Sequence, residues 1–254
     1  MDVEIIAHRG SSFLAPENTL AAVELAWQEG ADAVEGDFRL TVDGQIVCLH
    51  DDSLMRTAGV DLRPCKSTLA ELRKYDIGAW KSPQFVGQHI VTLAELLATV
   101  PPGKRYFVEI KCGPEITNEL TRIIDSSGLP ADQIVIISLD ANTICHIKQA
   151  IPQCPAYWVV EFKQSAPNSH WAPNVEELLK AARDCRADGL DLMATSPIEA
   201  GPLNTALIDS LKSAGLDRCV WTVDDPILAQ SLINLGIQGI TTNRPGWLRQ
   251  QLLA

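Results

Sequence analysis

Phe107-Val108-Glu109-Ile110-Lys111 is a short stretch in which apolar and charged residues alternate. This alternation is typical of a strand, because successive side chains of a strand point to opposite faces of its sheet. Val108 and Ile110 would face covering helices, whereas Glu109 and Lys111 would face inward together. Buried charges are costly unless they are paired. The stretch therefore predicts a strand whose inner face carries either a plain ion pair or part of a polar site.

Apolar runs of similar length recur along the chain and alternate with longer amphipathic segments. This order is typical of a parallel sheet covered by helices. Helical patterns fill the gaps, for example at Asn18–Gly30 and Val175–Cys185. The eight strand candidates are Val3–Ala7, Ala33–Asp37 together with Gln45–His50, Tyr106–Lys111, Ile134–Ser138, Ala156–Val160, Gly189–Leu192, Arg218–Val223 and Gly239–Thr242. They predict an α/β fold, a (β/α)8 TIM barrel, rather than an open doubly wound sheet.

One segment, residues 51–92, interrupts the alternation. It contains Arg63-Pro64 and Lys81-Ser82-Pro83, and the only helix expected in it lies near Leu69–Tyr75. We predict a modest irregular loop insertion after the second strand. Long loops often cover a substrate, so the segment is either a lid or a packed surface excursion.

Composition and charge restrict the partners. The length of 254 residues fits a single domain, 1–254, with a full core. A net charge of -11 disfavours nucleic acid and anionic membranes as partners, because both repel an acidic surface, and a small-molecule substrate is favoured.

No stretch approaches the roughly 20 apolar residues that span a bilayer, and the acidic start Met1–His8 leaves no room for a signal peptide. We expect a cytoplasmic protein without stable membrane insertion; the sequence indicates no oligomeric state.

Three carboxylates form a candidate metal site. Glu35 and Asp37 stand two residues apart on an expected strand, so both point to the same face. Because such groups repel one another when buried, a metal or an arginine must compensate them. Glu109 on the next strand would complete an all-oxygen set for one Mg²⁺ or Ca²⁺. Lys111 would then offset the negative charge or contact phosphate. The alternative is a set of ion-paired carboxylates without a metal.

Two histidines end expected strand segments. His8 follows the first strand and His50 follows Gln45–Leu49, so in a barrel both can face the same mouth. Hydrolysis requires one proton to be taken from the attacking oxygen and another to be given to the departing oxygen, and imidazole does both near neutral pH. A lone histidine is usually structural, but two beside clustered carboxylates predict an acid and base pair.

Arg9 and Glu17 are the remaining polar candidates near the first strand. Arg9 could reach a phosphate or neutralise Glu17 or Glu35. Glu17 is either a site residue or a favourable charge at the start of the first helix, where Asn18 or Thr19 would provide the cap.

The order of these motifs resembles the glycerophosphodiester phosphodiesterase family. The resemblance spans nearly the whole chain and is far more specific than a short isolated pattern. It rests on Ala7-His8-Arg9-Gly10, Ala15-Pro16-Glu17-Asn18-Thr19, Glu35-Gly36-Asp37, Thr41-x-Asp43-Gly44, Leu49-His50-Asp51-Asp52 with Arg56-Thr57, Glu109-Ile110-Lys111, Trp221-Thr222-Val223-Asp224 and Thr241-Thr242-Asn243-Arg244-Pro245.

The resemblance implies a barrel enzyme that hydrolyses glycerophosphodiesters to glycerol 3-phosphate and an alcohol. It implies one divalent cation, Mg²⁺ or Ca²⁺, held by Glu35, Asp37 and Glu109. We expect in-line displacement, with either water or the neighbouring glycerol hydroxyl as the nucleophile.

The resemblance also assigns roles around the cation. It implies that His8 and His50 are the acid and base pair, and that Arg9 and Lys111 contact phosphate. Trp221, which ends a late strand, would form part of the substrate wall; otherwise it is an ordinary buried indole.

Two features depart from the family pattern. Gly36 stands where the family more often has a bulky apolar residue, so we expect different packing at that strand but the same direction of the ligands. The loop at residues 51–92 is shorter than the insertion domain of some members, which leaves the choice of alcohol open.

Two rival functions are also compatible with the sequence. The first is a phospholipase D-like barrel acting on lysophospholipids or sphingolipids, which would require a membrane-seeking surface. The second is a catalytically inactive phosphate-binding barrel.

Overall fold

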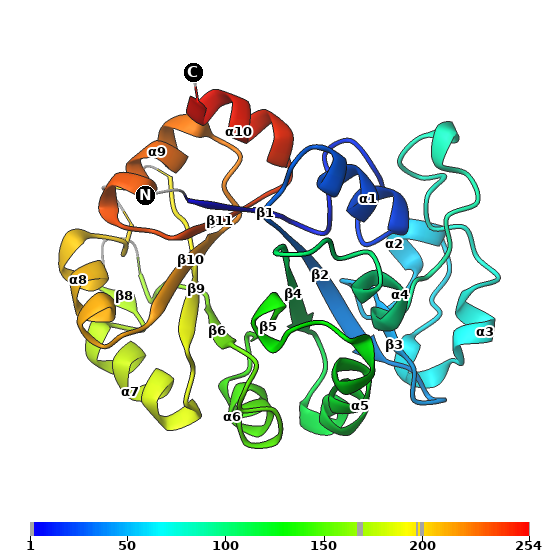
Figure 1. The fold of residues 1–254 in the computed structure, drawn as a ribbon, viewed down its shortest axis with the longest axis horizontal. Helices are drawn as coiled ribbons and strands as arrows, with labels where there is room; N and C mark the ends of the chain where they lie inside the picture. Colours follow the sequence, from blue (N-terminus) through cyan, green and yellow to red (C-terminus); the bar gives the residue numbers. More distant parts are fainter. Residues whose placement is uncertain (1–2, 167–169, 197, 199–200, 254) are drawn as a thin grey trace.

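Eight parallel strands close into a barrel in the computed structural model, which describes residues 3–166, 170–196, 198 and 201–253 (Figure 1). The barrel strands are β1 (Glu4–Ala7), β2 (Ala33–Leu40), β4 (Arg105–Ile110), β5 (Ile134–Ser138), β6 (Ala156–Val160), β9 (Gly189–Met193), β10 (Asp217–Trp221) and β11 (Gly239–Thr242). Closure occurs at β1, where Ile6 pairs with Ala33 of β2 and with Thr241 of β11. The predicted (β/α)8 barrel is confirmed.

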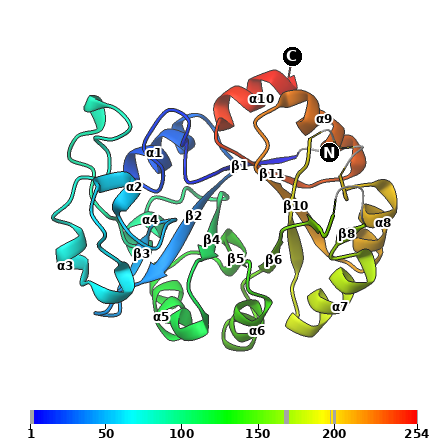
Figure 2. The ribbon, with the colours of Figure 1, turned by 180° about the vertical axis from the view of Figure 1, so that it is seen from behind.

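Helices surround the barrel on all sides, as the two opposite views show (Figures 1 and 2). They are α1 (Leu20–Gln28), α4 (Leu93–Leu97), α5 (Thr117–Ser127), α6 (Ala141–Ala150), α7 (Val175–Cys185), α8 (Thr205–Ser213), α9 (Pro226–Leu235) and α10 (Pro245–Leu253). Short 3-10 turns η3 (Pro114–Ile116) and η4 (Ala131–Gln133) lead into α5 and β5, and β7 (Lys163–Gln164) pairs with β8 (Trp171–Ala172) outside the barrel.

The apolar core has an outer and an inner part. The outward side chains of the strands pack against the helices; Val34 and Val108 do so on one side, and Leu190 and Val220 on the other. A smaller cluster that includes Phe107 fills the barrel interior. Removing apolar surface from water stabilises this arrangement by roughly 25 cal/mol per Å². A filled interior restricts the polar site to the end of the barrel.

The second strand is longer than the sequence indicated, because it continues beyond Asp37 into a hairpin. β3 (Ile46–Cys48) pairs antiparallel with the end of β2, with Phe38 opposite Cys48. A tight turn joins the two strands, and Gly44 adopts a φ of 78° that favours glycine. The predicted segment Gln45–His50 is therefore a hairpin partner rather than a barrel strand.

The first helix begins at Leu20, not at Asn18 as the apolar spacing indicated. Of the two expected caps, Thr19 is the cap, because its side chain accepts a hydrogen bond from the N–H of Ala22. Asn18 has a φ of 58° and its side chain turns into the barrel site instead.

The insertion 51–92 lies on the flank of the barrel, beside β3 (Figure 1). It contains α2 (Met55–Ala58), η1 (Pro64–Lys66), α3 (Leu69–Leu72) and η2 (Pro83–Phe85). The expected helix near Leu69–Tyr75 is present but ends at Leu72. The insertion packs on a small apolar cluster of its own, made of Val47, Leu49, Leu54, Leu72, Ile77 and Ile90. Burial of this kind favours the packed excursion over the lid.

Among the described residues, no helix combines the length and the apolar character needed to cross a bilayer.

Candidate active site

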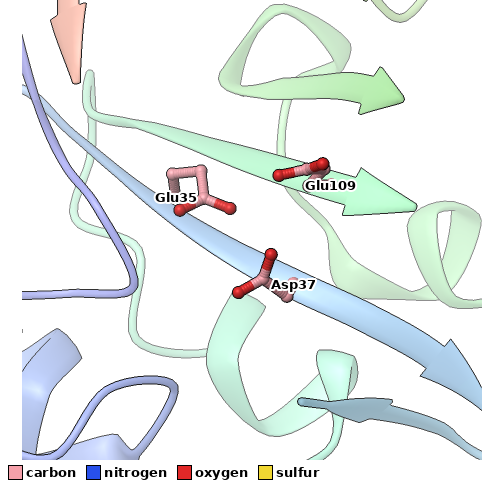
Figure 3. A group of neighbouring side chains, drawn as sticks. All are labelled: Glu35, Asp37 and Glu109. Atoms are coloured by element: carbon pink, nitrogen blue, oxygen red, sulfur yellow. The ribbon is translucent and has the colours of Figure 1, made fainter. Parts of the chain in front are cut away.

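Three carboxylates converge at the end of the barrel. Glu35 and Asp37 point inward from β2, and Glu109 on β4 pairs in register with Asp37 (Figure 3). One oxygen from each residue lies within 4.8 Å of the others, and all three residues are buried. The alternation of two neighbouring strands thus brings together the acidic groups that the sequence predicted.

Two cationic side chains compensate part of this charge. Lys111 Nζ donates to Glu109 Oε1 at 2.6 Å and lies 3.1 Å from Asp37 Oδ1. Arg9 Nε lies 3.1 Å from Asp37 Oδ2. Burial alone would raise the pKa of Asp37, but these two cations outweigh burial and lower it. Burial and the neighbouring carboxylates Asp37 and Glu109 raise the pKa of Glu35 well above its usual range.

The remaining imbalance fits a cation. Three carboxylates face two cationic side chains. Among the described residues, the buried Glu35 Oε1 has no hydrogen-bond partner, and Asp37 Oδ1 has only its 3.1 Å ion pair with Lys111. An unpaired carboxylate oxygen such as Glu35 Oε1 is costly in a protein interior. A donor set made only of carboxylate oxygens suits a hard divalent ion such as Mg²⁺ or Ca²⁺. The plain Glu109–Lys111 ion pair is also present, and it is compatible with a cation between the other oxygens.

Asn18 fixes one of these carboxylates. Its Nδ2 donates to Asp37 Oδ2 at 2.8 Å, and its Oδ1 accepts from the backbone N–H of Asp37 at 3.2 Å. Cys48 donates its thiol to the same Oδ1. The sequence signal at Asn18 was read only as a helix cap, so its role beside the acidic cluster was missed.

Both predicted histidines face the same cavity, an open space of about 490 Å³ including its mouth. A hydrogen bond holds Nδ1 of each ring: His8 Nδ1 lies 2.8 Å from Asn243 Oδ1, and His50 Nδ1 lies 2.8 Å from Asp51 Oδ1. Asn243 Nδ2 donates to Asp224, so its Oδ1 must accept from the His8 ring.

These contacts determine which ring nitrogen can accept a proton. Because Nδ1 carries the hydrogen in both neutral rings, Nε2 is the basic nitrogen of each. Within the described part of the chain, neither Nε2 has a hydrogen-bond partner; that of His8 lies 4.0 Å from Glu35 Oε2. Burial, followed by the charge of Arg9, lowers the pKa of His8 to about 4.

Most of the predicted site residues line this one cavity. They are His8, Arg9, Glu35, His50, Glu109, Lys111 and Trp221. Trp221 ends β10, and its indole N–H donates to the carbonyl oxygen of Asp191 at 3.1 Å. Trp221 therefore lines the cavity, and its contact with a substrate stays a prediction. No described residue of the insertion 51–92 lines the cavity.

Asp37 and Glu17 are the two predicted residues that do not line the cavity. Asp37 is fully buried and contacts the cavity residues Arg9 and Lys111. Glu17 lies behind Arg9: its Oε1 accepts from Arg9 Nη1 at 2.8 Å, and Arg56 donates to both of its oxygens. This geometry is that of a residue that orients Arg9. Direct contact between Glu17 and a substrate stays a prediction.

Two further carboxyl residues that line the cavity, Asp191 and the exposed Glu161, were not among the predicted site residues. Asp191 lies in the middle of β9, is 3% exposed and lines the same cavity. The only signal was a charged residue inside the apolar run Gly189-Leu190-Asp191-Leu192, and that run was interpreted simply as a strand.

Fold and site together define a class of protein: a (β/α)8 barrel whose mouth combines a buried acidic cluster able to hold a metal with two histidines and two cationic side chains. The sequence pattern of the glycerophosphoryl diester phosphodiesterase family matches residues 8–247. The chain belongs to this family.

Individual relatives agree with this membership. A glycerophosphodiester phosphodiesterase of Caldanaerobacter subterraneus is 29% identical over 96% of both chains, and one of Bacillus subtilis is 28% identical over 94% of this chain and 83% of its own. Among solved structures, a phosphodiesterase of Oleispira antarctica in complex with the product sn-glycerol-3-phosphate superposes with a TM-score of 0.85. It is 27% identical, and the match covers 99% of this chain and 97% of that one.

Proposed function

We propose that this protein hydrolyses glycerophosphodiesters to glycerol 3-phosphate and an alcohol in a reaction that depends on one divalent cation, Mg²⁺ or Ca²⁺. The observation that carries the proposal is one cavity lined by two histidines, two cationic side chains and two members, Glu35 and Glu109, of the three-carboxylate cluster. Family membership and the named activities of the relatives support it.

The cation would be held by Glu35, Asp37 and Glu109, where it would withdraw charge from the phosphate oxygens and orient the diester. Arg9 and Lys111 supply the rest of the positive field. Both line the cavity and are already held by carboxylates, so little reorganisation is needed when a phosphate arrives. Glu17 acts through Arg9 by fixing the guanidinium.

His8 and His50 move the protons. One Nε2 takes the proton of the attacking oxygen and the other, protonated, gives a proton to the departing alkoxide. Asn243 and Asp51 hydrogen-bond to Nδ1 of His8 and His50, respectively, and so fix the orientation of each ring. In-line displacement then needs the attacking and leaving oxygens on opposite sides of the phosphorus.

A panel assay tests the function. Glycerophosphocholine, glycerophosphoethanolamine and lysophosphatidylcholine are each incubated with the EDTA-treated protein and then with Mg²⁺, Ca²⁺ or Mn²⁺ restored. We expect turnover of the glycerophosphodiesters only with a divalent ion. A preference for lysophosphatidylcholine would favour the phospholipase D-like alternative over the proposal. The absence of turnover with every diester would favour the catalytically inactive phosphate-binding barrel.

Isotope labelling resolves the nucleophile. If water attacks directly, oxygen-18 from the solvent enters the glycerol phosphate in the first step. If the neighbouring glycerol hydroxyl attacks, a cyclic phosphate accumulates and then decays. Both routes use the same two histidines, so the labelling tests the nucleophile independently of the acid and base assignment. A cytoplasmic location and a single domain spanning 1–254 complete the proposal.

A further inference from the structure

Asp191 is a buried carboxyl that the mechanism above does not use. It lies on β9, and it is 3% exposed. Among the described residues, its Oδ1 has no hydrogen-bond partner. Lys111, a cationic residue that lines the same cavity, pairs with Asp37 and Glu109. A buried polar atom without a partner is costly, so its presence in a folded protein calls for an explanation, such as a bound group or a catalytic role.

The position of Asp191 relative to the acidic cluster is fixed by the strand order. Around the closed barrel, β9 is four strands from β2 in either direction, through β4, β5 and β6 or through β1, β11 and β10. Asp191 therefore projects from the wall opposite Glu35 and Asp37. The cavity lies between these walls, since it is lined by both Glu35 and Asp191.

The surroundings of Asp191 select an uncharged polar partner. Ile137 and Val159 line the cavity on the same side, and Val159 is its register partner on β6. Burial, with a smaller contribution from the charge of Glu109, raises the pKa of Asp191 well above its usual range. A neutral carboxyl offers one donor and one acceptor, which matches the hydrogen-bonding capacity of an alcohol. The indole N–H of Trp221 donates a 3.1 Å hydrogen bond to the carbonyl oxygen of Asp191 and thereby holds the backbone of Asp191 in place.

We infer that Asp191 binds the terminal hydroxyl of the substrate's glycerol, across the cavity from the phosphate, and so selects glycerol over alcohols that lack this hydroxyl. The inference rests on the proposed function, since it takes the phosphate to lie at the acidic cluster. It assigns Asp191 to substrate binding and specificity, not to proton transfer.

The test compares two diesters with the same leaving alcohol. One is glycerophosphoethanolamine; the other carries propane-1,2-diol in place of glycerol, which removes the terminal hydroxyl and keeps the hydroxyl next to the phosphate ester. The parent protein should prefer the glycerol diester about 10- to 100-fold in kcat/KM, as expected for one buried hydrogen bond. Asp191→Leu should reduce the preference to about twofold or less and leave the propanediol diester nearly unaffected, whereas Asp191→Asn should keep much of it.

Matched variants separate this role from general effects. Asp188→Asn alters a carboxyl just before the same strand, where it accepts from the N–H of Ala156 and pairs with Lys148 outside the cavity, so the preference should be unchanged. If Asp191→Leu does not fold, as judged by circular dichroism, Asp191→Ala provides the same comparison.

Three outcomes would overturn the inference. Equal losses on both diesters would indicate a structural role, and an unchanged preference would remove Asp191 from the glycerol site. If Asp191→Leu lowered kcat/KM on ethanolamine diesters but not on the corresponding ethanol diesters, Asp191 would be assigned to binding the amine of the leaving alcohol. If the parent protein hydrolyses no diester, calorimetry can compare its binding of sn-glycerol 3-phosphate with its binding of propanediol phosphate. This comparison tests whether Asp191 recognises the terminal hydroxyl without requiring hydrolysis. Failure of the proposed function and failure of this inference are therefore distinguishable.

Discussion

The side-chain amide of Asn18 donates a 2.8 Å hydrogen bond to Oδ2 of Asp37, one of the three clustered carboxylates. Asn18 belongs to the loop after β1 and Asp37 lies on β2, so the contact joins this loop to the strand that carries two of the clustered carboxylates. Because this bond holds Oδ2 while Oδ1 lies 3.1 Å from Lys111, the orientation of the carboxylate is fixed from both oxygens. Partners of this kind commonly determine how well a metal ligand is positioned.

We predict that Asn18→Gly weakens divalent-metal affinity about 10- to 100-fold. Glycine is chosen because Asn18 has a φ of 58°, and glycine tolerates this backbone conformation without strain. Calorimetric titration of the EDTA-treated protein with Mn²⁺ measures the change. The matched control is Thr19→Ala, which removes the neighbouring helix cap and should cost about 1 kcal/mol of stability but no metal affinity. An unchanged Mn²⁺ affinity of Asn18→Gly would contradict the prediction.

Removal of either histidine should slow turnover without loss of the metal. We expect His8→Ala and His50→Ala each to lower kcat about 10²- to 10⁴-fold on glycerophosphoethanolamine, because each removes one proton transfer. Mn²⁺ titration should show nearly parental affinity in both. His146→Ala is the control, since this exposed ring on α6 bonds only to the carbonyl of Asn142 in the described structure. Well-folded variants that turn over as fast as the parent would disprove the acid and base assignment.

The glycine between two metal-site carboxylates is required by its neighbours. A Cβ on Gly36 would lie 2.8 Å from the hydroxyl oxygen of Tyr106 and 3.2 Å from the sulfur of Cys48. Tyr106 is fully buried, and its hydroxyl has no hydrogen-bond partner among the described residues. This phenol fills the space that a larger side chain would need, which explains the departure from the family pattern at Gly36.

We predict that Gly36→Ala destabilises the protein by about 1 to 3 kcal/mol through overpacking. Tyr106→Phe should be nearly neutral, because the hydroxyl that it removes is unpaired. Combined with Gly36→Ala, it should recover at least half of the lost stability. Urea denaturation of the two single variants and the double variant provides the coupling energy. Purely additive effects would show that the clash is not with Tyr106.

The pH dependence of stability should depend partly on Asp32, at the opposite end of the barrel from the site. Its Oδ2 accepts from the N–H of Ile5 at 3.1 Å and from Arg249, and Lys104 donates to Oδ1 at 3.1 Å. Partial burial alone would raise the pKa of Asp32, but these contacts outweigh it and lower the pKa. A lowered folded-state pKa stabilises the protein above the unfolded value, and this stability is lost as the pH falls through the folded value.

We therefore expect Asp32→Asn to cost about 1 kcal/mol at pH 7, after allowing for solvent screening of partly exposed pairs. The difference from the parent should persist down to about pH 4, the ordinary range of an aspartate, and shrink below it. Urea unfolding at pH 7, 5 and 3 measures this trend. A difference that stays constant from pH 7 to pH 3 would mean that the charge of Asp32 does not stabilise the fold.

The local pattern of the chain predicted much of the fold. Alternation at Phe107–Lys111 predicted that Glu109 and Lys111 share one face. In the structure Glu109 lies on β4, and Lys111, directly after its end, bonds to Glu109. The hairpin after Asp37 was not predicted, because the pairing of β2 with β3 depends on a turn at Gly44 rather than on hydrophobic period. The start of α1 was misplaced for a similar reason: Asn18 and Thr19 are both good caps, and only the position of Asp37 distinguishes them.

By itself, the sequence determined the class of fold and the candidate chemical groups, since strand period, helix period and the order of motifs are local properties of the chain. Only the tertiary structure decided that Glu17 stands behind Arg9 and that Asn18 supports Asp37. It further decided that the insertion contacts the site residues His50 and Glu17 through Asp51 and Arg56, while no described residue of the insertion lines the cavity. It also decided that Asp191 faces Glu35 across the barrel. The physical reason is closure: strands far apart in the chain become opposite walls of one cavity only when β1 pairs with both β2 and β11.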